Sequence, residues 1–166
     1  MTDMTPVDVT LARSKRCDIS TDGGTTWLQI YGINDFNDEI DPTMADASDY
    51  ATDGWASSVK TLQGWKLTLK ANRKRAADEG AEDPAFVALR AARLSFGAAG
   101  KVSVRWGRTD GLEEAYQGRA DVAMSPSKTG VADLDEWQIE LTGDGKAEAI
   151  TVPTEWTTEG GGGSGE

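Results

Sequence analysis

The sequence contains no histidine and a single cysteine, Cys17, among its 166 residues. Without histidine it lacks the commonest general base and a common metal ligand, which excludes Ser-His and Cys-His nucleophiles and His-zinc sites. One thiol cannot form an internal disulfide, so the fold must be stable without one. No apolar run approaches the ~20 residues that cross a bilayer, and the N-terminus has no signal-peptide pattern. We therefore expect a chain made in a cytoplasm, with no membrane partner.

Basic residues are also scarce, because 28 Asp and Glu stand against 17 Lys and Arg, a net charge of -11. This balance argues against a protein that binds nucleic-acid phosphates or anionic lipid. Adjacent acids such as Asp38/Glu39 and Asp135/Glu136 are better explained as solvated surface groups than as the acid pair of a hydrolase. The acids of residues 35–53 lack the spacing of a calcium loop. We expect no enzymatic activity, no metal and no cofactor.

Alternating apolar residues are typical of strands in most of the chain. The clearest case is Trp65, Leu67, Leu69 and Ala71, and similar alternations occupy 101–106, 116–124 and 136–141. Shorter strands are predicted at 13–19, 27–33 and 147–152, and a loop at 125–130. Asp83 and Pro84 begin a predicted helix over about 84–96, which Gly97 and Gly100 end.

These elements predict a mainly β (α+β) fold, an antiparallel β-sandwich with one flanking α-helix. The length suits one domain with a core of its own. We assign residues 1–12 to an N-terminal arm, residues 13–156 to the domain and residues 157–166 to a flexible Gly-rich tail.

Residues 34–60 have no sustained period of 2 or 3.6, so they are predicted to form a long loop. They carry seven acidic residues and one base, together with Phe36, Tyr50 and Trp55, which predict a partner surface. Residues 61–132 have 12 basic and 8 acidic residues. Such a distribution suits head-to-tail self-association. The alternative is that both groups of charges are merely solvated, which is commoner for a single charged run.

The six tryptophans have two interpretations. Exposed rings would form a platform for sugars, whereas packed rings would serve the core and interfaces. Trp65, Trp106 and Trp137 continue apolar alternations and are predicted to be core. The other three, Trp27, Trp55 and Trp156, are assigned to contacts between molecules. The segment 27–33 is partly apolar on both faces, so it is either buried on both sides or meets another molecule.

An ordered set of short motifs resembles a known family. The set comprises Trp27–Ile33, Phe36, Ile40-Asp41-Pro42-Thr43, Asp53-Gly54-Trp55 and Gly64–Leu69. In this order it resembles the major tail tube protein of phages with long, non-contractile tails, especially those infecting actinobacteria. The predicted helix and the Trp106-Gly107 pair also fit, so the resemblance covers most of residues 13–153.

The resemblance implies a structural virion protein. Six sandwich subunits would form a ring, in which the inner sheets join into one β-barrel, and rings would stack into a tube that delivers genomic DNA. The protein would lie in the virion tail after assembly in the host cytoplasm. Its partners would be other copies of itself, the tape-measure protein, the tail terminator and the distal tail proteins, with DNA passing through unbound.

The resemblance and the charge pattern together name candidate residues. The loop 34–60 would contact the neighbouring ring through Phe36, Asp38, Glu39, Ile40, Asp41, Tyr50, Asp53 and Trp55. Its basic counterpart would be Arg73, Lys74 and Arg75. Trp27, Leu28, Ile30 and Tyr31 would form the inter-subunit sheet, and Asp121, Glu136 and Glu140 would face an acidic lumen that repels DNA. The alternative function is a carbohydrate- or surface-binding module that uses exposed tryptophans.

Overall fold

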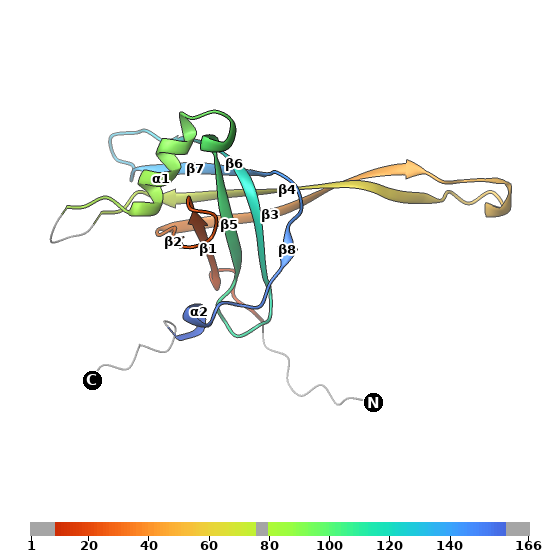
Figure 1. Cartoon of the computed structure of the whole chain (residues 1–166), viewed down its shortest axis with the longest axis horizontal. Helices are drawn as coiled ribbons and strands as arrows, with labels where there is room; N and C mark the ends of the chain where they lie inside the picture. The colour runs from red at the N-terminus through yellow and green to blue at the C-terminus, as the bar shows by residue number, and fades with distance from the viewer. Residues whose placement is uncertain (1–8, 76–79, 159–166) are drawn as a thin grey trace.

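The computed structural model describes residues 9–75 and 80–158, and these form a mainly β structure. The strands are β1 (Lys15–Ser20), β2 (Leu28–Gln29), β3 (Ile33–Asp46), β4 (Ser58–Asn72), β5 (Lys101–Arg108), β6 (Ala115–Lys128), β7 (Glu136–Gly143) and β8 (Glu148–Ala149). The helices are α1 (Pro84–Arg93) and α2 (Thr154–Thr158), with 3-10 turns at Tyr50–Thr52 and Gly97–Gly100. All strand pairs are antiparallel, in the order β2-β1-β5-β6-β7-β4-β3, with β8 beside β6 (Figure 1).

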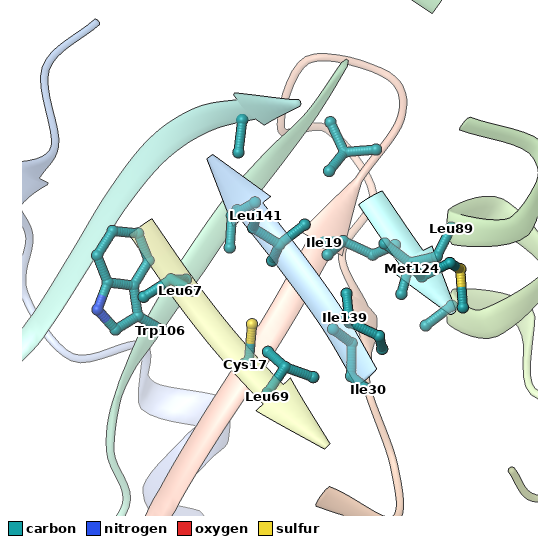
Figure 2. Close-up of a cluster of buried hydrophobic side chains, with 14 of the residues drawn as sticks. Cys17, Ile19, Ile30, Leu67, Leu69, Leu89, Trp106, Met124, Ile139 and Leu141 are labelled. Carbon is teal, nitrogen blue, oxygen red and sulfur yellow. The ribbon is translucent and has the colours of Figure 1, made fainter. Parts of the chain in front are cut away.

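Strand β6 belongs to both halves of the sheet. Residues 115–121 pair with β5, whereas residues 120–128 pair with β7. The sheet therefore continues through β5 and β1 on one side and through β7 and β4 on the other. Side chains from both halves form one core, which includes Cys17, Ile19, Leu67, Leu69, Ile139 and Leu141 (Figure 2). The predicted antiparallel sandwich with one flanking helix is thus confirmed.

The indole of Trp65 joins the two halves of this core. It stacks on Trp106 of the opposite half with ring centroids 4.8 Å apart. The ring lies against two glycines, because a Cβ atom at Gly118 or Gly143 would come within 2.5 or 2.3 Å of it. A side chain at either position would displace the indole, so the glycines permit the close approach of β6 and β7 to this ring.

Helix α1 begins where the sequence predicted. Asp83 accepts a hydrogen bond from the Ala85 amide and Pro84 occupies the first turn. The buried stripe is formed by Ala85, Phe86, Leu89 and Ala92. The helix ends at Arg93, three residues earlier than predicted, and Gly97 follows with a φ of 60°.

Three predicted local structures were wrong. Residues 34–60 are not a loop, because β3 and β4 continue into them as a long hairpin. The predicted strand 27–33 is interrupted, since only Leu28–Gln29 form a strand beside β1 and the chain turns at Gly32, with a φ of 79°, before β3 begins. In β6, pairing continues through residues 125–128, where a loop was expected. Most of the predicted N-terminal arm and of the Gly-rich tail lies outside the described residues, so the domain limits stay predictions.

Candidate self-association surfaces

The β3–β4 hairpin extends well beyond the rest of the molecule (Figure 1). We call residues 41–64 the arm and the remaining described residues the body. Cross-strand pairing continues along the arm from Asp41 opposite Gly64 to Asp46 opposite Ser58. No side chain of the arm is buried, whereas Trp65, the next residue of β4, is only 5% exposed. The arm is therefore a two-stranded structure with no layer packed against it.

Apolar side chains lie on both faces of the arm. Leu62 and Val59 oppose Thr43 and Ala45, which are two residues apart and so share one face. The other face carries Pro42 and Met44, in line with Ile40 of the body. Leu62 is 70% exposed and Val59 54% exposed. An isolated two-stranded hairpin is marginally stable in water, and apolar groups on both faces are typical of a surface covered in an assembly.

The end of the arm, residues 47–57, is held by short hydrogen bonds, and we call it the tip. Ala47 and Ser57 are joined through the Ala47 amide and the Ser57 carbonyl, and the hydroxyl of Ser48 accepts a bond from the Ser57 amide at 2.9 Å. Asp49 accepts from the Ala51 amide at 2.9 Å. Hydrogen bonds from Ser48 hold the pKa of the Asp46 carboxyl below its ordinary value. The backbone of the tip is thus ordered from within.

Two aromatic rings project from this ordered tip. Trp55 is 80% exposed and Tyr50 is fully exposed. The tip also carries Asp49 and Asp53, and Asp46 precedes it, with no basic residue between 46 and 59. The combination of a fixed backbone with exposed aromatic and acidic groups suits a docking element.

The outward face of β6, β7, β4 and β3 is polar. The registers align three rows of side chains across the four strands, and strand alternation places them on the face opposite the core. The rows are Asp121, Thr142, Lys66 and Glu39; Ala123, Glu140, Thr68 and Asn37; and Ser125, Gln138, Lys70 and Asp35. Four acids and two lysines give this polar face a net charge of -2.

The same four strands end in two unpaired edges. Within the described chain, β3 has no partner on its outer side, and residues 122–128 of β6 pair with β7 alone. Unpaired edges of this length are sites at which another chain can add a strand. The unit β6-β7-β4-β3 is therefore open on both sides.

A basic cluster lies at the opposite end of β4 from the arm. Arg73 is bonded to Glu82 and lies 3.7 Å from Asp135. Glu82 also accepts a hydrogen bond from Arg90 at 2.8 Å. Lys74 and Arg75 follow and are exposed. These residues line an open hollow of about 390 Å³. We call Arg73, Lys74 and Arg75 the basic end.

The structure separates the predicted contact residues into two groups. Tyr50, Asp53 and Trp55 lie together on the tip, and Asp41 begins the arm. The remaining four belong to the body part of β3. Phe36 packs against the core, Asp38 accepts a hydrogen bond from the Trp106 indole at 2.9 Å, Glu39 lies on the polar face and Ile40 is about half exposed.

Glu136 was wrongly assigned to a lumen. It is 4% exposed and accepts hydrogen bonds from Asn34 and Ser127, each at 2.7 Å. These bonds, the Ser127 bond first, hold the pKa of its carboxyl below the ordinary value. Asp121 and Glu140 do lie on the polar face, where they are bonded to Lys101 and close to Lys66 respectively. Their exposure to a lumen stays a prediction.

The predicted inter-subunit residues 27–31 are mostly occupied within the chain. Ile30 is 4% exposed and belongs to the core, and Leu28 packs against it. The Trp27 ring lies 4.5 Å from the Arg105 guanidinium. Tyr31 remains 53% exposed. Ile30 is thus unavailable to a neighbouring copy, and the prediction for it was wrong.

Trp156, expected to contact another molecule, is instead buried on the outer face of β1 and β5. It is 1% exposed and donates from its indole to Asp18 at 3.0 Å. Asp18 also accepts from Arg16 at 2.9 Å and from Arg105 at 3.0 Å, and Arg105 bonds Glu155. This cluster fixes α2 on the body. In the sequence, Asp18 and Arg105 each occupy an outward position of an alternating strand. That was only a weak signal for the burial of Trp156, because nothing local connects either residue to it.

Comparisons with known proteins identify the fold. No family model and no curated protein matches the sequence. A chain of the tail of an empty gene transfer agent particle, refined with C6 symmetry, matches with a TM-score of 0.66 at 9% identity, over 86% of this chain and 100% of that chain. The SPP1 tail tube matches with a TM-score of 0.63 at 17% identity, over 88% and 84% of the two chains. A chain of the virion of the native gene transfer agent gives 0.64 at 7% identity, over 86% and 100%.

This chain has a tail tube fold. The resemblance to tail tube proteins noted from the sequence is confirmed for the fold. The resemblance to the actinobacterial type is untested. In the described part of the tail tube fold, no helix combines the length and apolar character needed to traverse a lipid bilayer. Nor do three or more acidic or cysteine side chains in the described ranges converge as metal ligands.

Proposed function

We propose that this protein is a structural subunit of a tail tube and forms rings of six copies that stack in a virion tail. The observation that carries the proposal is the contrast between a body with a complete core and a β6-β7-β4-β3 unit with open edges and an uncovered arm. The likeness to chains from tail assemblies over most of the sequence supports the same function. No catalytic step is part of it.

Ring formation would use the two open edges. The outer edge of β3 in one copy pairs with residues 122–128 of β6 in the next, so that each copy adds four strands to a common sheet. Closure of the ring removes both exposed edges of the β6-β7-β4-β3 unit, which a barrel achieves and an open sheet does not. This joint replaces the predicted one at residues 27–31, since Ile30 is buried in the core.

The polar face would line the lumen of the tube. With a net charge of -2 per copy, a ring of six carries -12 on this face. Lys66 and Lys70 lie opposite the acids Glu39 and Asp35 of β3, and Lys66 also lies 3.5 Å from Glu140 of β7. A surface of this charge repels phosphate groups, so DNA passes without being held.

The arm would reach the adjacent ring. Its apolar groups have no partner within the described chain and would be covered there. Tape-measure, terminator and distal tail proteins are the further partners that such a tube requires. Their contacts would lie in the lumen and at the two ends of the tube.

The test is electron microscopy of the purified protein beside an armless variant. In that variant Asp41 is joined to Gly64 through Asn-Gly, because these two residues are directly opposite and a two-residue turn closes such a pair. The full chain should form rings and tubes in negative stain. The armless chain should keep the thermal unfolding transition of the body and form no tubes. A full chain that stays monomeric at high concentration would refute the proposal.

The sugar-binding alternative has little support from the tryptophans. Trp65, Trp106 and Trp156 are buried, and arginine guanidinium groups cover the rings of Trp27 and Trp137. Trp55 alone of the six is largely exposed, and one ring does not form a platform. Quenching of tryptophan fluorescence by oligosaccharides in a monomeric protein would favour that alternative.

A further inference from the structure

The two ends of β4 carry opposite charge. The strand runs for 15 residues, about 50 Å in extended form, from the acidic tip before Ser58 to the basic end after Asn72. The tip of a copy therefore cannot contact the basic end of that same copy. In a head-to-tail arrangement, however, the acidic tip of one copy faces the basic end of the next.

The basic end keeps part of its charge free. Glu82 is shared between Arg73 and Arg90, and Asp135 lies beside Arg73. Neither Lys74 nor Arg75 is ion-paired within the part of the chain that the structure describes. The hollow beside them, about 390 Å³, lies in the size range of sites that hold one small group.

Within the described residues, guanidinium groups already lie over the rings of Phe86, Trp137, Trp27 and Trp156. Arg73 lies 5.1 Å from the Phe86 ring, Arg93 5.3 Å from Trp137 and Arg105 4.5 Å from Trp27. Such cation–π contacts are favourable, and tryptophan is the best aromatic partner. Trp55 at the tip has no such contact within the described residues. Its ring is exposed, so a second copy can reach it.

We infer that the basic end is the receptor for the tip of a copy in the adjacent ring. The inference rests on the proposed function and names the contact between rings. The Trp55 ring lies against the guanidinium of Arg75, while Asp49 and Asp53 pair with Lys74 and Arg75. Because docking covers an aromatic anchor and matched charges together, it fixes both the order and the polarity of stacking.

A nucleic-acid phosphate is the competing occupant of a basic hollow. Glu82 and Asp135 line the same hollow, and the whole chain carries -11, both of which disfavour phosphate. Retention of the full chain on a heparin column at 150 mM salt would favour phosphate and overturn the inference. We expect the protein to flow through.

Charge reversal tests the pairing directly. The tip variant D49K/D53K and the end variant K74E/R75E should each fail to form tubes, since like charges then meet. The chain carrying all four substitutions should form tubes again, because its basic tip meets an acidic end. If one double variant failed only because it misfolded, adding the two substitutions of the other double variant would not restore tube formation. Tubes from both double variants, or none from the fourfold variant, would overturn the inference.

The aromatic anchor is tested by W55A and W55F, with F96A as the matched control. Phe96 is 93% exposed in the body and lies outside the proposed contact. We expect W55A to raise the critical concentration for tube formation about tenfold or more, W55F to raise it less, and F96A to leave it unchanged. Equal effects of W55A and F96A would contradict the role of Trp55.

Failure of the inference and failure of the proposed function give different results. If the wild-type chain forms tubes that tolerate the charge and Trp55 variants, the protein is a tube subunit with another contact between rings. If the wild-type chain forms no tubes, the proposed function itself is wrong. Negative-stain images of all variants beside the wild type distinguish the two.

Discussion

The body and the arm share the strands β3 and β4, but the two regions are stabilised differently. In the body, β4 alternates buried and half-buried residues from Trp65 to Asn72, and two sheet halves enclose its apolar side. In the arm, the same ladder of hydrogen bonds continues with no residue buried. Backbone pairing can thus extend a strand past the core, but the free energy that holds the extension must come from elsewhere.

This difference assigns separate consequences to substitutions in the two regions. A truncated side chain in the body leaves a cavity and lowers the free energy of unfolding. A truncated side chain in the arm leaves no cavity in the free chain and should act on association alone. Matched pairs, one residue from each region, therefore sharpen or break the comparison.

The largest effect is expected for the pair Trp156 and Trp55. W156A removes a buried indole and its bond to Asp18, and it should lower the free energy of unfolding by about 3–5 kcal/mol. W55A should change it by less than about 0.5 kcal/mol, because that ring is exposed. Urea denaturation of the full chain, kept monomeric by low protein concentration, measures both values. Similar losses for the two variants would erase the distinction between body and arm.

The second pair is Leu69 and Leu62 on β4 itself. Leu69 is fully buried, so L69A should cost about 2–5 kcal/mol. Leu62 is 70% exposed, so L62A should leave the free energy of unfolding within about 0.5 kcal/mol of wild type. It should weaken tube formation instead. Chemical denaturation and sedimentation of the same samples separate the two readouts. A stability loss in L62A near that of L69A would mean that the arm folds against the body in solution.

A third comparison uses two glycines near the junction of the regions. A Cβ atom at Gly143 would lie 2.3 Å from the Trp65 indole, so G143A should cost about 1–3 kcal/mol through overpacking. At Gly64 the nearest atom is 4.0 Å away, and G64A should be nearly neutral. The shift of Trp65 fluorescence in G143A gives an independent reading of the displaced ring. Equal stability of both variants would show that β6 and β7 move apart readily.

The smallest effect is the pH dependence contributed by Glu136. Its pKa is lower in the folded chain than its ordinary value of 4.5, because Ser127 and Asn34 bond the carboxylate. The carboxylate therefore stabilises the fold above that ordinary value, and the contribution is lost as the pH falls through the folded pKa. E136Q should be less stable than wild type at pH 7 and closer to it at pH 3. A stability difference that does not change between these pH values would contradict this account.

The sequence predicted the body better than the arm, and the reason is physical. Strand periodicity arises because one face is buried, as it does for Leu67 and Leu69. The arm buries neither face, so residues 41–46 show no alternation and resemble a loop. The start of α1 was predictable because Asp83 and Pro84 act locally, within one turn.

Burial that depends on residues far apart in the chain left at most a weak signal in the sequence. Trp156 is covered because its indole donates to Asp18, which also accepts a hydrogen bond from Arg105. Asp18 is 138 residues away in the sequence. Glu136 has the alternation of an outward residue, yet Asn34 and Ser127 close over it. By contrast, the acidic surroundings of Tyr50, Asp53 and Trp55 favoured a contact surface, and the structure leaves these residues exposed together on the tip, where the contact stays a prediction.

The bond between Trp156 and Asp18 sets an order for folding during synthesis. Strand β1 and helix α2 close on each other, so the charged groups on the outer face of β1 remain uncovered until residue 156 has been synthesised. A product truncated before residue 154 would expose Asp18 and Arg105 without their cover. Such a fragment would be poorly folded, and in the proposed tube it would be a poor substitute for the complete subunit.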